Sequence, residues 1–466
     1  MIWTRTSLAI LTLALTAPAV AAPSCAAFVD VNIVSTDRPQ VLQHETVLVE
    51  SGKIASIGTG ARMPAGCTRI DGHDRYLIPG LADTHAHVFG YSRGGEGDRA
   101  SETAIMHMLL ANGVTTAVLM EGSPATLNLR KEVASGGILG PKLYTAGPII
   151  QAPDTGAPPH RRTFETPEEV RREVEQEKQL GYDFVKVHGA MPKETYAELL
   201  ATARRVGLPV IGHVPDNLGI DAGLDGGQVM IAHAESYLQT YFEFNRKLPT
   251  NSAEIDQMAR GVARRTAKAH VYVQPTLSVF RQIIAQVGNP ESLLDRPEMQ
   301  LMTPVSVSDW QPGSDPYLLH WTVSNLAYFR AQYRVMQRLV SALRDAGVPM
   351  LMGTDDMVPM QLPGFSMRDE AVQLQEAGLT PFEVLQTATL RPAEFLHRAN
   401  RSGRIAPGYD ADLVLLAADP LENAGNLFRQ DGVMLHGRWF SEAQLQTMLW
   451  SANEAGRKSN SPPRKR

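Results

Sequence analysis

Leu77-Ile-Pro-Gly-Leu-Ala-Asp-Thr-His85-Ala-His87 is the stretch on which the interpretation of this chain depends. It begins as an apolar, strand-like run and ends in two histidines one residue apart. Side chains two positions apart on a strand point to the same face, so His85 and His87 can hold one metal ion from a single strand end. Neutral imidazole is a common ligand of zinc and similar ions. The pair alone is equally compatible with one surface histidine and one core histidine.

Four further candidate ligands each close a short apolar run downstream. The runs and their candidates are 183–188 with Lys186, 208–215 with His213, 229–235 with His233, and 348–356 with Asp355. Amphipathic stretches of helical period separate several of these runs. Alternating strands and helices predict βαβ units and a parallel sheet. In a closed (β/α)8 barrel the carboxyl ends of all strands meet on one face, so residues far apart in the sequence converge there.

With these residues in this order, the chain resembles the amidohydrolase superfamily of metal-dependent hydrolases, from about Phe28 to Phe440. The C-terminal segment 403–416 and the preceding 378–385 are also typical of it. Within the superfamily the chain is most similar to an exported branch of prolidase-like and imidazolonepropionase-like proteins. The resemblance implies an α/β fold, a TIM barrel with a small discontinuous β-sandwich formed by both chain ends. We expect the barrel at 77–400 and the sandwich module at 22–76 plus 401–440.

The resemblance also implies two divalent metal ions, with zinc the expected metal. His85, His87 and Asp355 would hold one ion, and His213 and His233 the other. Lys186 would react with CO₂ to give N6-carboxylysine, whose two oxygens bridge the ions. An unmodified lysine, with a pKa of about 10.4, would instead repel a metal. The alternative is an ion pair between Lys186 and Asp355 in a metal-free barrel, because a buried charge needs a partner.

The reaction expected at such a centre is hydrolysis of a carbon–nitrogen bond, in an amide or a peptide-like substrate, by metal-bound hydroxide. Asp355 is the expected catalytic residue, which takes the hydroxide proton and passes it to the leaving amine. Asp356 would point the opposite way on the same strand. The same centre could attack a cyclic amide, a lactone or a phosphoester. A non-catalytic exported binding protein is the alternative of another class, and it would lack ligands that this chain has.

Other polar side chains are candidates for substrate contact or for a structural role. His188 lies two residues beyond Lys186 and faces the same way. Tyr237 follows His233, and His160 lies in a polar loop. Asp83 shares a face with His85 and could either orient a histidine or form a salt bridge with an arginine.

Composition limits the size of the molecule and its partners. The chain has 466 residues, of which 43% are hydrophobic and 20% are charged, which suits one large barrel and a smaller module. The net charge of −5 predicts no broad basic face, so we expect no nucleic-acid partner. A small molecule or short peptide is the expected substrate. Association into a homo-oligomer is left open.

The two ends of the chain look like processing and tail segments. Residues 1–21 combine Arg5, a short apolar core and the small-x-small pattern at 19–21, which predicts a signal peptide and export to the periplasm or medium. The apolar core is shorter than the roughly 20 residues needed to span a bilayer, so no transmembrane segment is expected. A retained anchor is the alternative. Residues 451–466 read as a basic, disordered tail.

The only two cysteines, Cys25 and Cys67, both fall outside the expected barrel. In an exported chain an even pair predicts a disulfide. Lipid attachment at Cys25 and free thiols are the alternatives.

Two further features concern the helices and one long connection. Thr166-Pro-Glu-Glu and Thr380-Pro-Phe-Glu each read as a helix start with a capping box. The segment that includes 303–317 is too long for an ordinary connection, and it predicts either a lid or substrate wall, or a packing excursion.

Overall fold

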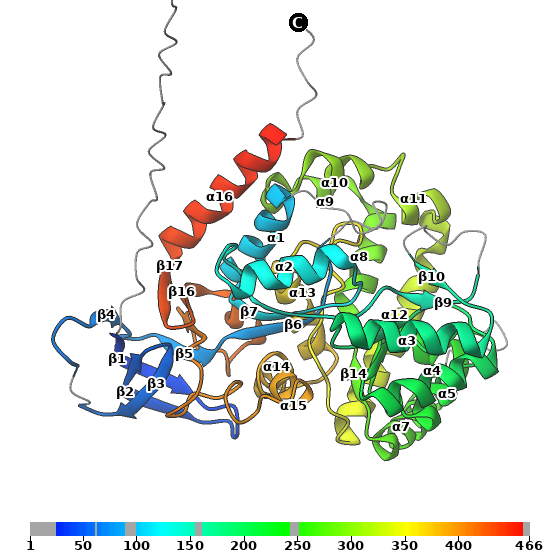
Figure 1. Cartoon of the computed structure of the whole chain (residues 1–466), viewed down its shortest axis with the longest axis horizontal. Coiled ribbons are helices and arrows are strands. Elements are labelled where there is room, and N and C mark those ends of the chain that lie inside the picture. Colours follow the sequence, from blue (N-terminus) through cyan, green and yellow to red (C-terminus); the bar gives the residue numbers. More distant parts are fainter. Residues whose placement is uncertain (1–24, 61–62, 89–98, 154–160, 243–250, 460–466) are drawn as a thin grey trace, which may run out of the picture.

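The computed structural model describes residues 25–60, 63–88, 99–153, 161–242 and 251–459. It contains a sheet built from both ends of the chain and a TIM-barrel-like α/β unit (Figure 1). The expected signal peptide and the last seven residues of the expected tail lie outside the described residues.

Both ends of the chain contribute to one eight-stranded sheet. Its order is β17-β16-β15-β5-β1-β2-β3, with β4 paired to β1. The strands are β1 (Cys25–Val34), β2 (Val41–Glu50), β3 (Lys53–Gly58), β4 (Thr68–Asp71), β5 (Tyr76–Pro79), β15 (Leu413–Leu416), β16 (Gln430–Leu435) and β17 (Arg438–Ser441). The discontinuous module is therefore present as a single hydrogen-bonded sheet, and its division into the two layers of a sandwich stays a prediction.

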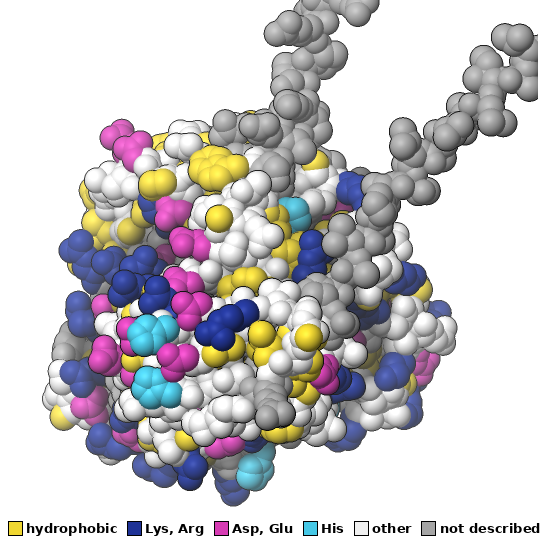
Figure 2. Space-filling model, turned by 90° about the vertical axis from the view of Figure 1, so that its left-hand side faces the viewer, with side chains coloured by type: hydrophobic (Ala, Val, Ile, Leu, Met, Phe, Trp, Pro, Cys, Tyr) yellow, Lys and Arg dark blue, Asp and Glu magenta, His cyan; other side chains and the backbone are white. Residues whose placement is uncertain are grey.

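The central joint of this sheet is β5. It pairs with β1 in parallel and with β15 in antiparallel, so it links the two ends of the chain. Seen from the side of this sheet, basic, acidic and histidine side chains are interspersed on the surface (Figure 2). After β5 only Gly80 intervenes before the first barrel strand. A side chain at Gly80 would collide with Thr115, so this junction needs a glycine.

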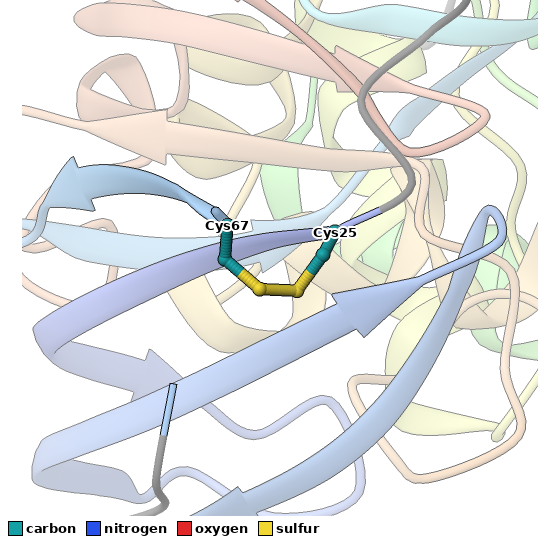
Figure 3. Close-up of a disulfide and its surroundings, with 2 residues drawn as sticks. All are labelled: Cys25 and Cys67. Atoms are coloured by element: carbon teal, nitrogen blue, oxygen red, sulfur yellow. A yellow bond between two sulfur atoms is a disulfide. The ribbon is translucent and has the colours of Figure 1, made fainter. Parts of the chain in front are cut away.

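A disulfide joins Cys25 to Cys67, as the sequence predicted (Figure 3). Cys25 begins β1, and Cys67 immediately precedes β4, the strand that pairs with β1. The Cα atoms are 4.7 Å apart, within the usual range for disulfides. The bond therefore fastens a strand to its sheet neighbour.

The barrel-like unit consists of two parallel sheets whose orders are β6-β7-β8 and β10-β9-β11-β12-β13-β14. The strands are β6 (Leu81–Ala86), β7 (Val114–Leu119), β8 (Lys142–Thr145), β9 (Ile150–Gln151), β10 (Arg162–Thr163), β11 (Val185–Val187), β12 (Val210–Gly212), β13 (Met230–Ala232) and β14 (Tyr272–Gln274). Every residue of β6 is buried, as expected for a strand covered on both faces.

Hydrogen bonds connect the two parallel sheets on both sides. The residue after β8, Ala146, forms an isolated bridge with Phe184. On the other side the segment 350–355 bridges to β14 and bonds to β6 through Thr84 N–H to Met352 O and Asp355 N–H to His85 O. The expected strand at 348–356 is not a regular strand, because Asp355 has a left-handed φ of 53° and Asp83 accepts the Thr354 N–H. Closure into an eight-stranded barrel stays a prediction.

Helices cover the outside of the strands (Figure 1). Both predicted capping boxes are present, at Thr166 with Glu169 and at Thr380 with Glu383. The helices are α1 (Arg99–Ala111), α2 (Pro124–Ala134), α3 (Pro167–Leu180), α4 (Lys193–Val206), α5 (Ile220–Gly226), α6 (Glu235–Tyr241), α7 (Ser252–Ala269), α8 (Leu277–Gly288), α9 (Glu291–Leu294), η1 (Pro297–Leu301), α10 (Pro304–Asp309), α11 (Pro316–His320), η2 (Val323–Asn325), α12 (Leu326–Asp345), α13 (Ser366–Glu376), α14 (Pro381–Ala388), α15 (Leu390–Phe395), η3 (Ala424–Phe428) and α16 (Glu442–Ser459).

The C-terminal helix α16 differs from the expectation for the tail. It packs on α1 and continues through residues 451–459, which the sequence assigned to a disordered tail. Leu445 and Leu449 are buried in the main core, so the apolar face of the preceding turns supports the helix. Among the described residues, no helix combines the length and apolar character needed to cross a membrane.

We predict that the disulfide stabilises the sheet without taking part in catalysis. Replacing both Cys25 and Cys67 by alanine reopens a loop of 42 residues, which in the chain-entropy model costs roughly 4 kcal/mol. Denaturant unfolding of the double variant should show this loss, while the metal content of the folded fraction stays unchanged. Equal midpoints for the variant and the unreduced parent would contradict the prediction.

Candidate metal centre

A cavity of about 770 Å³ lies at the carboxyl ends of the parallel strands. All six predicted metal ligands line it, although they come from segments up to 270 residues apart. They are His85, His87, Lys186, His213, His233 and Asp355. The convergence follows from the parallel arrangement, which brings every strand end to one face.

Asp355 is the centre of the first group of ligands. Its Oδ1 lies 3.1 Å from Nε2 of both His85 and His87. Its Oδ2 lies 3.9 Å from Nε2 of His233. The donor atoms of His85, His233 and Asp355 lie within 4.8 Å of one another, close enough for one cation to contact all three.

The second group lies beside the first. The ring centroids of His213 and His233 are 4.5 Å apart, and those of His188 and His213 are 4.2 Å apart. Lys186 projects into the same cavity and is 1% exposed. Burial lowers the pKa of its amine to about 8, which brings the neutral form within reach. Among the described residues the ion pairs of Asp355 are with histidines.

Hydrogen bonds from the backbone fix the ligands to one another. The His213 N–H donates to Val187 O, the His233 N–H to Gln274 O and the Asp355 N–H to His85 O. Each ligand is thereby tied to the neighbouring strand end. His233 and Asp355 have φ values of 65° and 53°, a strained region for residues other than glycine.

Two hydrogen bonds orient the imidazoles from behind. Thr84 Oγ1 donates to Met352 O and accepts from Gln274 Nε2, so Gln274 Oε1 is left to accept from His85 Nδ1 at 2.6 Å. Thr276 Oγ1 donates to Pro275 O and therefore accepts from His233 Nδ1 at 2.6 Å. Both rings then carry their free lone pair on Nε2, the atom that faces Asp355.

Two glycines leave room for these side chains. A Cβ on Gly212 would lie 2.6 Å from Cδ of Lys186. A Cβ on Gly353 would lie 2.7 Å from the Cβ of His85 and 2.8 Å from the Gln274 amide. Any larger residue at either position would displace a candidate ligand or its hydrogen-bond partner.

The protonation states suit metal binding. Burial lowers the pKa of His85 to about 4 and holds the pKa values of His213 and His233 well below the ordinary value. Burial alone would raise the pKa of Asp355, but the adjacent His85 and His87 hold it well below the usual range. Neutral imidazoles around an ionised carboxylate are the forms that bind a cation.

The donor set fits divalent metal ions of the zinc type. Imidazole nitrogens and carboxylate oxygens are typical zinc ligands. Nδ1 of His213 is buried and has no hydrogen-bond partner within the part of the chain that the structure describes, although a buried polar atom normally has one. A cation bound in this cavity would be the partner that this atom lacks.

The structure corrects the expectations for two aspartates near the ligands. Asp356 belongs to the cavity lining together with Asp355, and the left-handed φ of Asp355 breaks the strand alternation on which its expected direction rested. Asp356 accepts the backbone N–H of His87, and burial beside Asp83 raises its pKa well above the ordinary value. Asp83 neither orients an imidazole nor pairs with an arginine. It accepts bonds from Thr354 and from the His85 N–H, so it fixes the backbone.

The three residues predicted to contact substrate differ in where the structure places them. His188 lines the cavity, and its Nδ1 lies 3.3 Å from a guanidinium nitrogen of Arg161. Tyr237 does not line the cavity: it is fully buried in the core and its hydroxyl lies 3.4 Å from Thr266 Oγ1, so its position favours a structural role. His160 lies outside the described residues.

Sequence reasoning missed several residues around the cavity. Arg161 and Glu121 line it, and Gln274 orients His85. Glu121 follows the end of β7 and Gln274 ends β14, so both occupy the strand-end position that identified the metal ligands. The long segment before residue 348 supplies a wall of the cavity, through α8, α11 and α12.

Comparisons with known proteins agree with this fold. The amidohydrolase family profile matches residues 76–440. Imidazolonepropionase from Mycolicibacterium smegmatis is 25% identical over 393 residues, which cover 81% of this chain and 85% of that protein. Bottromycin amidohydrolase has a similar structure, with a TM-score of 0.71, 24% identity and 95% coverage of both chains. A Xaa-Pro dipeptidase with bound methionine has a TM-score of 0.67 and 18% identity, with 90% of this chain and all of that chain covered.

The profile match spans most of the chain and includes both the candidate ligands and the strands that carry them. Members of this family generally use divalent metal ions, in keeping with the donor set described above. The chain therefore belongs to the amidohydrolase family and is a hydrolase that acts on carbon–nitrogen bonds.

Proposed function

We propose that this protein is an exported amidohydrolase with two metal ions, which cleaves an amide or peptide-like bond. The observation that carries the proposal is the position of Asp355 between the Nε2 atoms of His85, His87 and His233, beside the buried Lys186. Export is supported by the disulfide, which is a bond typical of oxidising compartments.

Each ligand has a defined place in this proposal. His85, His87 and Asp355 would hold one ion, and His213 with His233 the other. Lys186, carboxylated by CO₂ to N6-carboxylysine, would reach both ions. Bound zinc ions would lower the pKa of water and polarise the scissile carbonyl.

Asp355 is the residue proposed to move the proton. Its Oδ1 already faces two imidazoles at 3.1 Å, whereas Oδ2 has only His233 at 3.9 Å. Oδ2 is therefore the oxygen that can accept a proton from the attacking water and return it to the leaving nitrogen. The low pKa of the resting carboxylate keeps Asp355 ready to act as a base near neutral pH.

We predict that Lys186→Ala loses both metal and activity. Alanine removes the side chain proposed to bridge the two groups of ligands. Elemental analysis should fall from about two metal ions per chain to one or fewer, and short carboxylic acids should restore part of the activity by replacing the lost carbamate. Lys142→Ala is the matched control, because Lys142 lies on β8 with a pKa also lowered by burial but does not line the cavity. Unchanged metal content in Lys186→Ala would exclude Lys186 as a ligand.

We predict that Asp355→Asn lowers kcat by at least the roughly 10²–10⁴-fold expected of a lost general acid–base group. Asparagine keeps an oxygen for the metal but cannot accept and return a proton. Asp356→Asn is the comparison: burial already favours its neutral form, so its kcat should fall at least tenfold less than that of Asp355→Asn. The reverse ranking in steady-state assays would transfer the proton-moving role to Asp356.

We predict that Gln274→Leu weakens metal binding although Gln274 touches no metal. It removes the acceptor that fixes the His85 Nδ1–H, and such partners are worth about 10–100-fold in metal affinity. Competition with a chromogenic chelator measures this change. Gln274→Glu keeps an acceptor and should retain more affinity than the leucine variant. Equal affinities for parent and Gln274→Leu would show that the bond does not orient the ligand.

A further inference from the structure

Exposed apolar side chains are concentrated in a short segment that also lines the catalytic cavity. Eight large apolar side chains are exposed in the described chain, and four of them fall within ten residues. These four, here called the rim, are Leu319, Trp321, Val323 and Tyr328, with exposed fractions of 61%, 39%, 67% and 43%. Exposed apolar side chains scattered singly need no explanation, but a cluster beside a cavity usually marks a binding surface.

The rim is continuous with the inside of the cavity. Trp321 and Tyr328 belong both to the rim and to the cavity lining. Trp321 packs edge-on against Phe329, with ring centroids 5.1 Å apart, and Tyr328 lies 6.0 Å from the same ring. Deeper in, the wall continues through apolar side chains of α8 and α12, namely Val279, Phe280, Ile283 and Met336. An apolar path therefore runs from the wall of the cavity to the surface.

The segment that displays the rim is held in a defined conformation. The buried Asp315 accepts the backbone N–H groups of Tyr317 and Leu318 and so begins α11. Trp310 is 4% exposed and anchors the preceding turn in the core. Thr322 and Asn325 form a capping box that starts η2. The four rim side chains stay in water although their backbone is well anchored.

We propose that the rim and the apolar wall bind the alkyl chain of a long-chain acyl group, so that the substrate is an amide of a medium- or long-chain fatty acid. This rests on the proposed function, which supplies the hydrolysis R–CO–NH–R′ + H₂O → R–COO⁻ + R′–NH₃⁺. The C–N bond breaks, a C–O bond forms, and the leaving nitrogen takes both protons of the water. The ligand is elongated because an apolar group confined to the cavity would leave Leu319 and Val323 uncovered.

The size of the cavity agrees with this substrate. Its volume of about 770 Å³ is in the upper part of the roughly 300–1,000 Å³ range of pockets that hold drug-sized ligands. The polar ligands of the metal centre form one side, and the wall of α8 and α12 forms another. A head group with its amide at the metal centre and an alkyl tail along the wall uses both sides.

The experiment measures binding and turnover separately. Full-length, zinc-loaded protein is titrated calorimetrically with N-acetyl-, N-hexanoyl- and N-decanoylglycine, and kcat/KM is measured for the same compounds. Each methylene that leaves water is worth up to about fourfold in affinity. Because the rim only partly covers the chain, we expect Kd to fall at least tenfold from hexanoyl to decanoyl.

Surface variants locate the effect on the rim. The double variant Leu319→Ser/Val323→Ser changes two exposed side chains that do not line the cavity, so the fold should be retained. It should reduce the ratio of decanoyl to acetyl affinity at least fivefold. Leu180→Ser is the matched control, because Leu180 is 52% exposed at the end of α3 and does not line the cavity.

The outcomes separate this inference from the proposed function. A Kd independent of chain length overturns the inference, and turnover of acetylglycine would then leave the proposed function intact. Chain-length-dependent binding that the double variant abolishes supports the inference even if no compound is hydrolysed, in which case the proposed reaction fails. Sedimentation could instead show that the parent is a dimer and the double variant a monomer, with the Kd for the acyl compounds unchanged. The rim would then be a contact between copies of the chain, and the inference would be overturned.

Discussion

The site depends on one constraint. Several imidazoles are buried, out of contact with water, around one ionised carboxylate. Burial keeps His85 and His233 neutral, and both rings turn Nε2 toward the carboxylate of Asp355. Such a group of polar side chains is costly inside a protein unless each has a partner. Gln274 and Thr276 offset part of that cost, because they accept hydrogen bonds from the two rings. The Nε2 lone pairs of both rings face Asp355, where a bound cation would offset the rest.

Several features of this arrangement follow from the sequence alone. Period-two alternation placed His85 and His87 on one face, and the structure puts both Nε2 atoms 3.1 Å from the same Asp355 oxygen. Parallel topology brought residues as distant as His85 and Asp355 to one cavity. The two capping boxes and the disulfide could also be predicted from the sequence, because each depends on local chemistry or on a single pair of residues.

Other features depend on backbone geometry that no local pattern reveals. Strand alternation does not continue through Asp355, because that residue adopts a left-handed φ. Tyr237 follows His233, whose φ is also left-handed, and α6 then turns the tyrosine into the core. The residues 451–459 look disordered by composition, yet the preceding turns of α16 bury Leu445 and Leu449 and extend the helix. In each case the local sequence pattern does not reveal the conformation that the backbone adopts.

The position of β5 has a consequence for the order in which this protein can assemble. β5 is the base from which the strand with His85 and His87 starts, and only Gly80 separates the two strands. One edge of β5 pairs with β1, but the other is completed only by β15, more than 330 residues later. During synthesis that edge stays open until almost the whole chain has emerged, and pairing over such a separation is slow. The metal site therefore becomes rigid late. The strand next to its first strand, β5, is paired on both edges only after β15 has been synthesised.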